Sequence, residues 1–208
     1  MELDNKLKKV SINLSKILRH QAENRNLKIN DGGWVKLDDI LKCKEFKGIS
    51  IDEINYIVEN NNKKRFSTNI VNDILYIRAN QGHSINKIKD DNLLTEIKDI
   101  NYINNVVHST FRKNLDLIKK NGLCKMKRNH IHFAKTKNVS SGIRKNADVY
   151  IYIDVVKAMN DGIKFYESSN GVILSPGIGK EGIISYKYFS DVEIEDKNWN
   201  ILLLNSNS

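Results

Sequence analysis

The sequence predicts an α+β protein with two unlike parts, a helix-rich N-terminal part and a strand-rich C-terminal part. Three amphipathic segments, over residues 4–22, near Asp38 and after Ser50, precede two strand-like runs joined by a polar turn. Three helices followed by a β-hairpin is the element order of a winged helix. From about residue 103 onward, strand-like runs separated by glycine-rich turns dominate. These observations favour two lobes over one uniform domain.

Local sequence signals support the predicted helices. Four apolar residues of the first segment recur on one helical face: Val10, Leu14, Ile17 and Leu18. Ser50 and Glu53 have the spacing of a capping box, which begins a third helix. That helix should turn four apolar residues inward: Ile51, Ile54, Ile57 and Val58. The strand-like runs of the first lobe cover residues 64–68 and 73–79.

The second lobe combines one helix with several strands. A strand is expected over residues 106–110, followed by a helix that Gly122 ends. Four more runs are expected to form strands: residues 130–134, 149–155, 171–175 and 183–194. The charged, irregular segment before residue 103 has neither pattern. We therefore expect a first lobe over residues 1–88, a linker over 89–102 and a second lobe over 103–208.

Composition restricts the class of protein and its partners. The chain has 208 residues, a net charge of +9 and a mean hydropathy of −0.48, with no apolar run long enough to cross a membrane. Its N-terminus lacks an apolar signal segment, which predicts a cytoplasmic protein. Cys43 and Cys124 are expected to be buried thiols, and no residue cluster has zinc-ligand spacing, so no metal is expected.

The basic charge is concentrated in the first part of the chain. Residues 1–89 hold 17 lysines and arginines against 11 acidic residues, and the remainder holds 17 against 14. A basic excess is typical of a protein that binds a polyanion such as nucleic acid. A solvated basic surface is an equally good interpretation of the charge alone.

Two groups of residues in the first lobe could bind phosphate. Arg19 and His20 end the first helix, where they could contact an anion or merely offset the helix dipole. Arg78 ends a strand, and the residues after it are rich in hydrogen-bond donors around a flexible glycine. The donors are Asn80, Gln81, His83 and Ser84. The alternative for this stretch is a polar turn around a salt bridge.

The second lobe adds two further candidates. His130 and His132 alternate along a predicted strand, so their side chains face one side of it. Arg144 follows a Ser-Ser-Gly turn, and alone it would be an ordinary exposed arginine. Taken together, the arginines and histidines predict a cleft between the lobes that recognises at least two phosphate groups. Composition and spacing alone do not identify the ligand or the reaction.

Five strings occur in an order that resembles one known family. They are "LSKILRH", "GGWVKLDDIL", "IRANQGHS", "GLCKMKRNHIHFA" and "ESSNGVILS". The chain resembles the tRNA (RNA) 2′-phosphotransferases, the KptA family, from about residue 11 to residue 194. The resemblance implies an N-terminal winged-helix RNA lobe and a C-terminal lobe with the ADP-ribosyltransferase fold, which holds NAD.

The resemblance also implies an activity. Members of the family remove an internal 2′-phosphate that remains at an RNA splice junction. The phosphate attacks the nicotinamide ribose of NAD and expels nicotinamide, which gives an ADP-ribosylated RNA phosphate. A neighbouring ribose hydroxyl then attacks the phosphorus, which releases 2′-hydroxyl RNA and ADP-ribose 1″,2″-cyclic phosphate. NAD is consumed, no metal is needed, and a monomer suffices.

The resemblance assigns roles to individual residues. The family's catalytic tetrad falls on Arg19, His20, Arg78 and Arg144, of which the first three would hold the 2′-phosphate together with Asn80, Gln81 and His83. NAD binding falls on His108, Ser109, Thr110, Arg128, His130 and Ser140, with His132 and Ser141 as weaker candidates. The family usually has glycine where this chain has Ser109.

Two other functions are consistent with the same sequence. The chain could instead be an ADP-ribosyltransferase that modifies nucleic-acid terminal phosphates or protein, using the same NAD site. It could also be a winged-helix nucleic-acid binder whose second lobe is inactive. Mass analysis of the products would distinguish such an ADP-ribosyltransferase from a 2′-phosphotransferase. Failure to bind NAD would favour the nucleic-acid binder.

Overall fold

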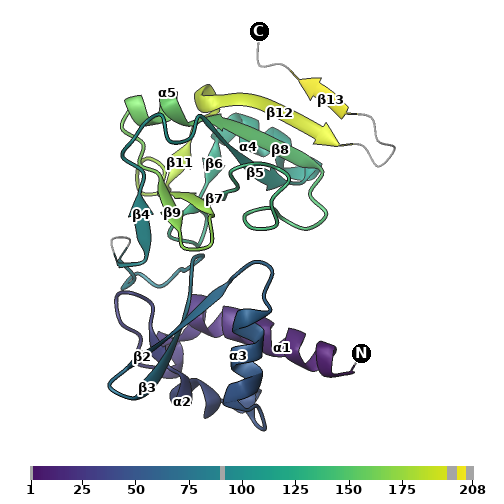
Figure 1. Cartoon of the computed structure of the whole chain (residues 1–208). Helices are drawn as coiled ribbons and strands as arrows, with labels where there is room; N and C mark the ends of the chain where they lie inside the picture. The colour runs from purple at the N-terminus through teal and green to yellow at the C-terminus, as the bar shows by residue number, and fades with distance from the viewer. Residues whose placement is uncertain (1, 90–91, 196–200, 205–208) are drawn as a thin grey trace. The chain divides into compact units, whose positions relative to one another are not determined.

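The computed structural model describes residues 2–89, 92–195 and 201–204 of the chain. The chain forms two compact units, residues 1–94 and residues 95–208, each with helices and strands. The predicted α+β class is confirmed. The two units are described separately below, with the element labels of Figure 1.

Unit 1 begins with helices and continues with a β-hairpin. Its helices are α1 (Glu2–Lys16), α2 (Leu37–Leu41) and α3 (Ile51–Glu59), with short helical turns η1 (Ile17–Gln21), η2 (Glu23–Arg25) and η3 (Lys44–Phe46). Its strands are β1 (Val35–Lys36), β2 (Phe66–Val71) and β3 (Ile74–Ala79), which form an antiparallel sheet in the order β1-β3-β2. The β2–β3 hairpin is the long ribbon that crosses the helices of this unit in Figure 1.

The local signals of the sequence explain these elements. Ser50 and Glu53 form the predicted capping box at the start of α3. Asn72 and Asp73 both have positive φ, at 50° and 59°, which is the geometry of a two-residue hairpin turn. Ile54 and Ile57 of α3 are buried as expected, whereas Ile51 is 42% exposed. The expectation for Ile51 was therefore wrong: it is the first residue of α3, and its side chain lies at the exposed end of the helix.

Unit 2 is rich in strands. One four-stranded sheet contains β5 (Asn105–Thr110), β8 (Val149–Asp154), β12 (Phe189–Glu195) and β13 (Ile201–Leu204), in the order β13-β12-β8-β5. A second contains β4 (Leu94–Glu96), β9 (Tyr166–Ser168), β10 (Ile173–Ser175) and β7 (Ile131–Phe133), in the order β4-β9-β10-β7. Strands β6 (Leu123–Cys124) and β11 (Ile183–Ile184) form a separate pair.

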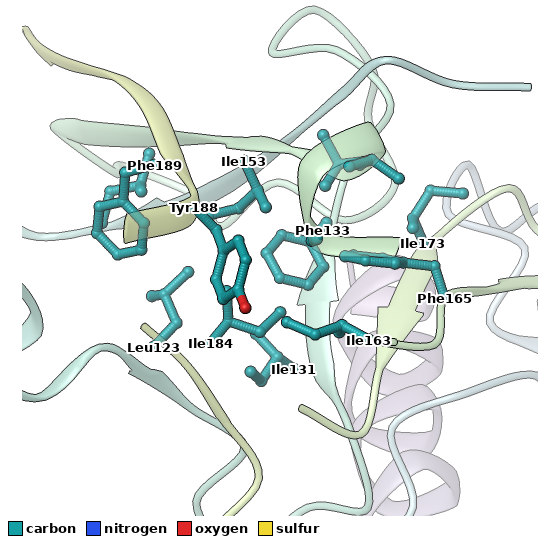
Figure 2. Close-up of a cluster of buried hydrophobic side chains, with 14 of the residues drawn as sticks. Leu123, Ile131, Phe133, Ile153, Ile163, Phe165, Ile173, Ile184, Tyr188 and Phe189 are labelled. Atoms are coloured by element: carbon teal, nitrogen blue, oxygen red, sulfur yellow. The ribbon is translucent and has the colours of Figure 1, made fainter. Parts of the chain in front are cut away.

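Short helices complete unit 2. They are α4 (Leu115–Asn121), α5 (Val155–Asn160), η5 (Arg112–Asn114) and η6 (Tyr186–Tyr188), and Gly122 ends α4 with a φ of 81°. The core between the sheets and helices is apolar, and Figure 2 shows Phe133, Phe165 and Tyr188 within it. An isolated bridge between Val107 and Ala134 connects β5 to the end of β7. The core therefore holds β5 and β7, which carry the histidines, in a fixed relation.

Three further expectations differ from the structure. Residues 183–194 form β11, η6 and β12 instead of one strand, because Ser185 caps the η6 turn between them. The segment expected as a linker, residues 89–102, contains β4, which pairs with β9. Cys43 and Cys124 are free and half-buried instead of buried. No helix in the described part of the chain is long and apolar enough to cross a membrane.

Candidate functional site

Arg19 and His20 lie in a π-helical turn. Helix α1 ends at Lys16 and continues as the π-helix η1, whose residues Ile17 and Leu18 are fully buried. Burial of these two residues leaves Arg19 half-buried and His20 exposed. Single π-helical turns within α-helices are rare and occur often at functional sites.

The loop after β3 is attached to this turn. The backbone N–H of Ser84 donates to the Arg19 carbonyl oxygen over 3.0 Å, and the Ser84 hydroxyl lies 2.9 Å from His20 Nδ1. Gly82 has a φ of 87°, and a Cβ atom there would lie 3.4 Å from Arg19 Nε. The structure thus places Arg19 and His20 beside the loop of residues 80–84.

Arg78 is held by contacts that leave its charge uncompensated. Its guanidinium carbon lies 4.5 Å from the centre of the Trp34 ring, and Nη1 donates to the carbonyl oxygens of Gly32 and Asn92 over 3.3 and 3.2 Å. Within the described residues Arg78 forms no ion pair, and its buried Nε has no hydrogen-bond partner. Burial lowers the pKa of Arg78, but a guanidinium remains charged at neutral pH.

A fixed, partly buried cation without a carboxylate is suited to an external anion. Strand β3, which carries Arg78, packs against η1, which carries Arg19 and His20. The three residues assigned to the 2′-phosphate therefore come from adjoining elements of unit 1. Trp34, whose ring stacks on the Arg78 guanidinium, was not predicted as a site residue. Its position directly after the Gly32–Gly33 turn was the available signal.

The remaining residues assigned to RNA phosphate have different environments. Asn80 is buried, and its side chain donates to the Lys64 carbonyl over 2.8 Å and accepts from the Ser67 hydroxyl over 2.7 Å. Both ends of the Asn80 side-chain amide thus bind other residues of unit 1 and stabilise the loop. His83 is also buried, and a Cβ atom on Gly33 would lie 3.3 Å from its Nε2. Gln81 is half-buried in the same loop.

In unit 2, His108 is at one end of a chain of three histidines. His108 Nδ1 lies 2.9 Å from the His132 carbonyl oxygen, and His132 Nδ1 lies 3.0 Å from the His130 carbonyl oxygen. Since a carbonyl only accepts, Nδ1–H of His108 donates and the neutral ring keeps Nε2 as an acceptor. Burial first, and then the charges of Arg144 and Arg128, lower the pKa of His108 to about 4.

Two arginines lie close to His108. The Arg144 guanidinium is 5.5 Å from the centre of the Phe111 ring, and its backbone N–H donates to the Ser109 hydroxyl over 2.6 Å. Burial, and then the charge of Arg144, lower the pKa of Arg128. Neither arginine forms an ion pair with a carboxylate in the described part of the chain. Two like charges without a carboxylate are a suitable environment for a bound anion.

The other predicted residues of unit 2 have different environments. His130 is buried against the Tyr166 ring, with ring centres 6.0 Å apart. Thr110 is buried, and its hydroxyl accepts from the Asn114 side chain over 3.2 Å. Ser140 is exposed in the loop between β7 and β8, beside the half-buried Ser141. Sequence periodicity could not indicate Phe111 or Tyr166, because each contributes through a ring contact that depends on the fold.

The unit 2 residues fit a nucleotide cofactor better than a metal. His108 offers an acceptor nitrogen, Ser109 an ordinary strand backbone without positive φ, and the arginines a positive field. These groups are complementary to an amide and to phosphates. Within the described residues, no three histidines, cysteines or acidic residues are grouped so that they could hold a metal ion.

The two basic, histidine-containing groups of residues are chemically suited to anionic ligands. Comparison with known proteins is more specific. The family described as RNA 2′-phosphotransferase, Tpt1 / KptA family, matches residues 5–177, which include every site residue discussed above. The chain belongs to this family.

The similarity to individual relatives covers most of this chain. A putative tRNA 2′-phosphotransferase of Schizosaccharomyces pombe is 46% identical over 187 residues, which are 88% of this chain and 50% of the relative. The tRNA 2′-phosphotransferase 1 of Danio rerio is 40% identical over 190 residues, which cover 88% of this chain and 83% of the relative. A probable RNA 2′-phosphotransferase of Flavobacterium johnsoniae is 36% identical over 83% of this chain and 92% of the relative. The chain thus spans half the length of the yeast relative and most of the other two.

Proposed function

We propose that the protein removes a 2′-phosphate from RNA in an NAD-dependent reaction. The observation that carries the proposal is Arg78, a stacked and partly buried guanidinium with no carboxylate partner in the described part of unit 1, beside the turn that holds Arg19 and His20. The family match and the names of the relatives support RNA as the carrier of the phosphate. The helix–hairpin order of unit 1 supports its assignment as a winged-helix RNA lobe.

The first step joins the RNA phosphate to ADP-ribose. A 2′-phosphate oxygen forms a bond to the ribose carbon that carries nicotinamide, the bond from that carbon to nitrogen breaks, and nicotinamide leaves with the electron pair. The phosphate is already an anion, so orientation matters more than a base. Arg19, His20 and Arg78 would hold the phosphate. Unit 2, which we assign the ADP-ribosyltransferase fold, would hold NAD through His108 and the backbone of Ser109, with Arg128 and His130 nearby.

The second step releases the RNA. The oxygen of the adjacent ribose hydroxyl forms a bond to phosphorus and loses its proton, the bond from phosphorus to the RNA 2′-oxygen breaks, and that oxygen gains a proton. The products are 2′-hydroxyl RNA and ADP-ribose 1″,2″-cyclic phosphate. Negative charge increases around phosphorus during this exchange, and arginine side chains such as Arg78 and Arg144 can stabilise it. His20, whose ring is exposed and oriented by Ser84, would transfer the proton.

The test uses a short RNA with one radiolabelled internal 2′-phosphate, incubated with the protein with and without NAD. NAD-dependent transfer of the label to a small cyclic phosphate is the expected result. Label that remains on RNA as an ADP-ribose adduct would favour the alternative of a transferase that modifies phosphates. RNA binding without any reaction, and no binding of NAD, would contradict the proposal and leave a nucleic-acid binder.

A further inference from the structure

One face of the unit 1 sheet carries a row of polar and aromatic side chains. Tyr76 of β3 pairs with Lys36 of β1 on one side and with Asn69 of β2 on the other. Side chains alternate along a strand, so Tyr76 shares its face with Arg78, about 6.8 Å further along β3. Ile77 between them points to the opposite face and is fully buried. The row of Lys36, Tyr76 and Asn69 therefore lies next to Arg78, on the face of the sheet opposite to the buried Ile77.

A cavity of about 520 Å³ opens over this row. Its walls include two aromatic residues, Trp34 and Tyr76, of which Trp34 also stacks on Arg78. The remaining lining residues are mostly polar or basic: Lys28, Ile29, Asn30, Lys36, Asn69, Val71 and Lys87. The volume is within the range of pockets that bind small organic ligands, and Trp34 is shared by this pocket and the Arg78 site.

The charge of the pocket is positive. Lys28, Lys36 and Lys87 line it, no lining residue is acidic, and none of these lysines has an ion pair with a described residue. The nearby carboxylate of Asp31 lies 3.6 Å from the Lys89 ammonium, outside the lining. Aromatic walls combined with uncompensated lysines are the composition of a single-stranded nucleic-acid site, where bases stack on rings and lysines neutralise phosphates.

We propose that this pocket binds the nucleotide next to the one whose 2′-phosphate Arg78 contacts. The base packs against Tyr76 and Trp34, and the lysines contact the flanking phosphates. The inference rests on the proposed function for the identity of the RNA. It adds a second subsite to unit 1, through which the protein distinguishes a phosphate within an RNA strand from an isolated phosphate.

The experiment compares two ligands without NAD, a nucleoside 2′-phosphate, which has no neighbouring nucleotide, and a hexanucleotide RNA with the same phosphate at its centre. The wild-type protein is expected to bind the hexanucleotide more tightly. Tyr76→Ala is expected to reduce this preference about tenfold, as loss of one base–aromatic stack does. Tyr76→Phe keeps the ring and should keep the preference. Tyr56→Ala, at a 55% exposed tyrosine of α3 outside the pocket, is the matched control.

A second measurement does not depend on the Tyr76 variant. The triple change of Lys28, Lys36 and Lys87 to glutamine should reduce the slope of log binding constant against log salt by about two. Lys47→Gln, at an exposed lysine outside the pocket, should leave the slope unchanged. Equal affinities for both ligands, or an unchanged slope in the triple variant, would overturn the subsite. If binding depends on Tyr76 but no 2′-phosphate is removed, the subsite stands and the proposed function fails.

Discussion

The backbone N–H of Arg144 donates a hydrogen bond to the Ser109 hydroxyl oxygen, with 2.6 Å between nitrogen and oxygen. Ser109 lies on β5 and is buried, so the bond attaches the loop that carries Arg144 to a strand of the core. The KptA resemblance puts glycine at this position, and glycine has no hydroxyl that could accept the bond. In this chain Ser109 is therefore a positioning residue for Arg144.

Ser109→Ala should loosen the Arg144 loop without removing a charge. We expect kcat/KM for NAD to fall about fivefold, because a typical hydrogen bond contributes about 1 kcal/mol. Steady-state kinetics with NAD as the varied substrate measures this effect. Ser175→Ala is the control, since Ser175 is another buried serine of unit 2, whose hydroxyl donates to the Lys164 carbonyl. An equal loss in both variants would show that Ser109 acts only through stability.

Gly142 lies in the same loop as Arg144, where the backbone passes close to Phe133 and Ala134. It has a φ of 86°, and a Cβ atom there would lie 2.8 Å from the Phe133 carbonyl oxygen, so backbone must move in a Gly142→Ala variant. Gly162 has a φ of 85° and nothing within 4 Å of an added Cβ, which makes Gly162→Ala a control with the same backbone strain. Both variants should lose about 1–2 kcal/mol of stability from strain alone. Only Gly142→Ala should also lose most of the NAD-dependent activity, and equal activities would contradict this role of the loop.

Arg78→Ala should abolish phosphate removal while the fold is retained. Loss of one preorganised donor to developing charge typically lowers the rate by about 10²–10³-fold. The rate of label release from 2′-phosphorylated RNA measures the effect, and circular dichroism checks the fold. Arg65→Ala is the control, because Arg65 is another partly buried arginine of unit 1, whose Nη1 donates to the Asn61 side chain over 3.0 Å. Normal turnover by Arg78→Ala would exclude Arg78 from the phosphate site.

Sequence patterns predicted those features that depend on neighbours along the chain. The capping box at Ser50 and the hairpin turn before Ile74 are local, and both are present. The π-helical turn at Arg19 was not predictable from the 3.6-residue period, because the bonds that accompany it involve Ser84, 65 positions later: its backbone N–H donates to the Arg19 carbonyl oxygen, and its hydroxyl is hydrogen-bonded to His20 Nδ1. Such contacts are fixed by tertiary structure.

The same limit applies to the site residues. Asn80 was expected to face a ligand as one of several donors in a row, yet the Lys64 carbonyl and the Ser67 hydroxyl use its amide. The effect of the Arg144 charge on the pKa of Arg128 depends on two loops that periodicity cannot place together. The type of residue at each position was therefore informative, but its partner was not.

His20→Ala should slow the second step more than the first. The His20 ring lies 2.9 Å from the Ser84 hydroxyl and is exposed, so it can exchange a proton with a bound RNA oxygen. We expect ADP-ribosylated RNA to accumulate, because attack by the phosphate on NAD needs no proton transfer. Gel separation of labelled RNA over time measures the intermediate. An unchanged level of intermediate would reject the proton-transfer role, and His20→Gln should resemble alanine if the proton is what matters.

His108 should make the stability of the protein depend on pH. The pKa of His108 in the folded protein is about 4, lowered from 6.5 mainly by burial. Between pH 6.5 and 4 the His108 ring therefore stays neutral in the folded protein, whereas in the unfolded chain it takes up a proton. The free energy of unfolding should therefore decrease as the pH falls from 6.5 to 4, by up to about 3 kcal/mol for this group. Urea denaturation at pH 7, 5.5 and 4.5 measures the decrease. His108→Asn keeps a donor for the His132 carbonyl but does not titrate, so its stability should fall less over the same range. If both proteins lose the same stability between pH 7 and 4.5, His108 is not held neutral by its surroundings.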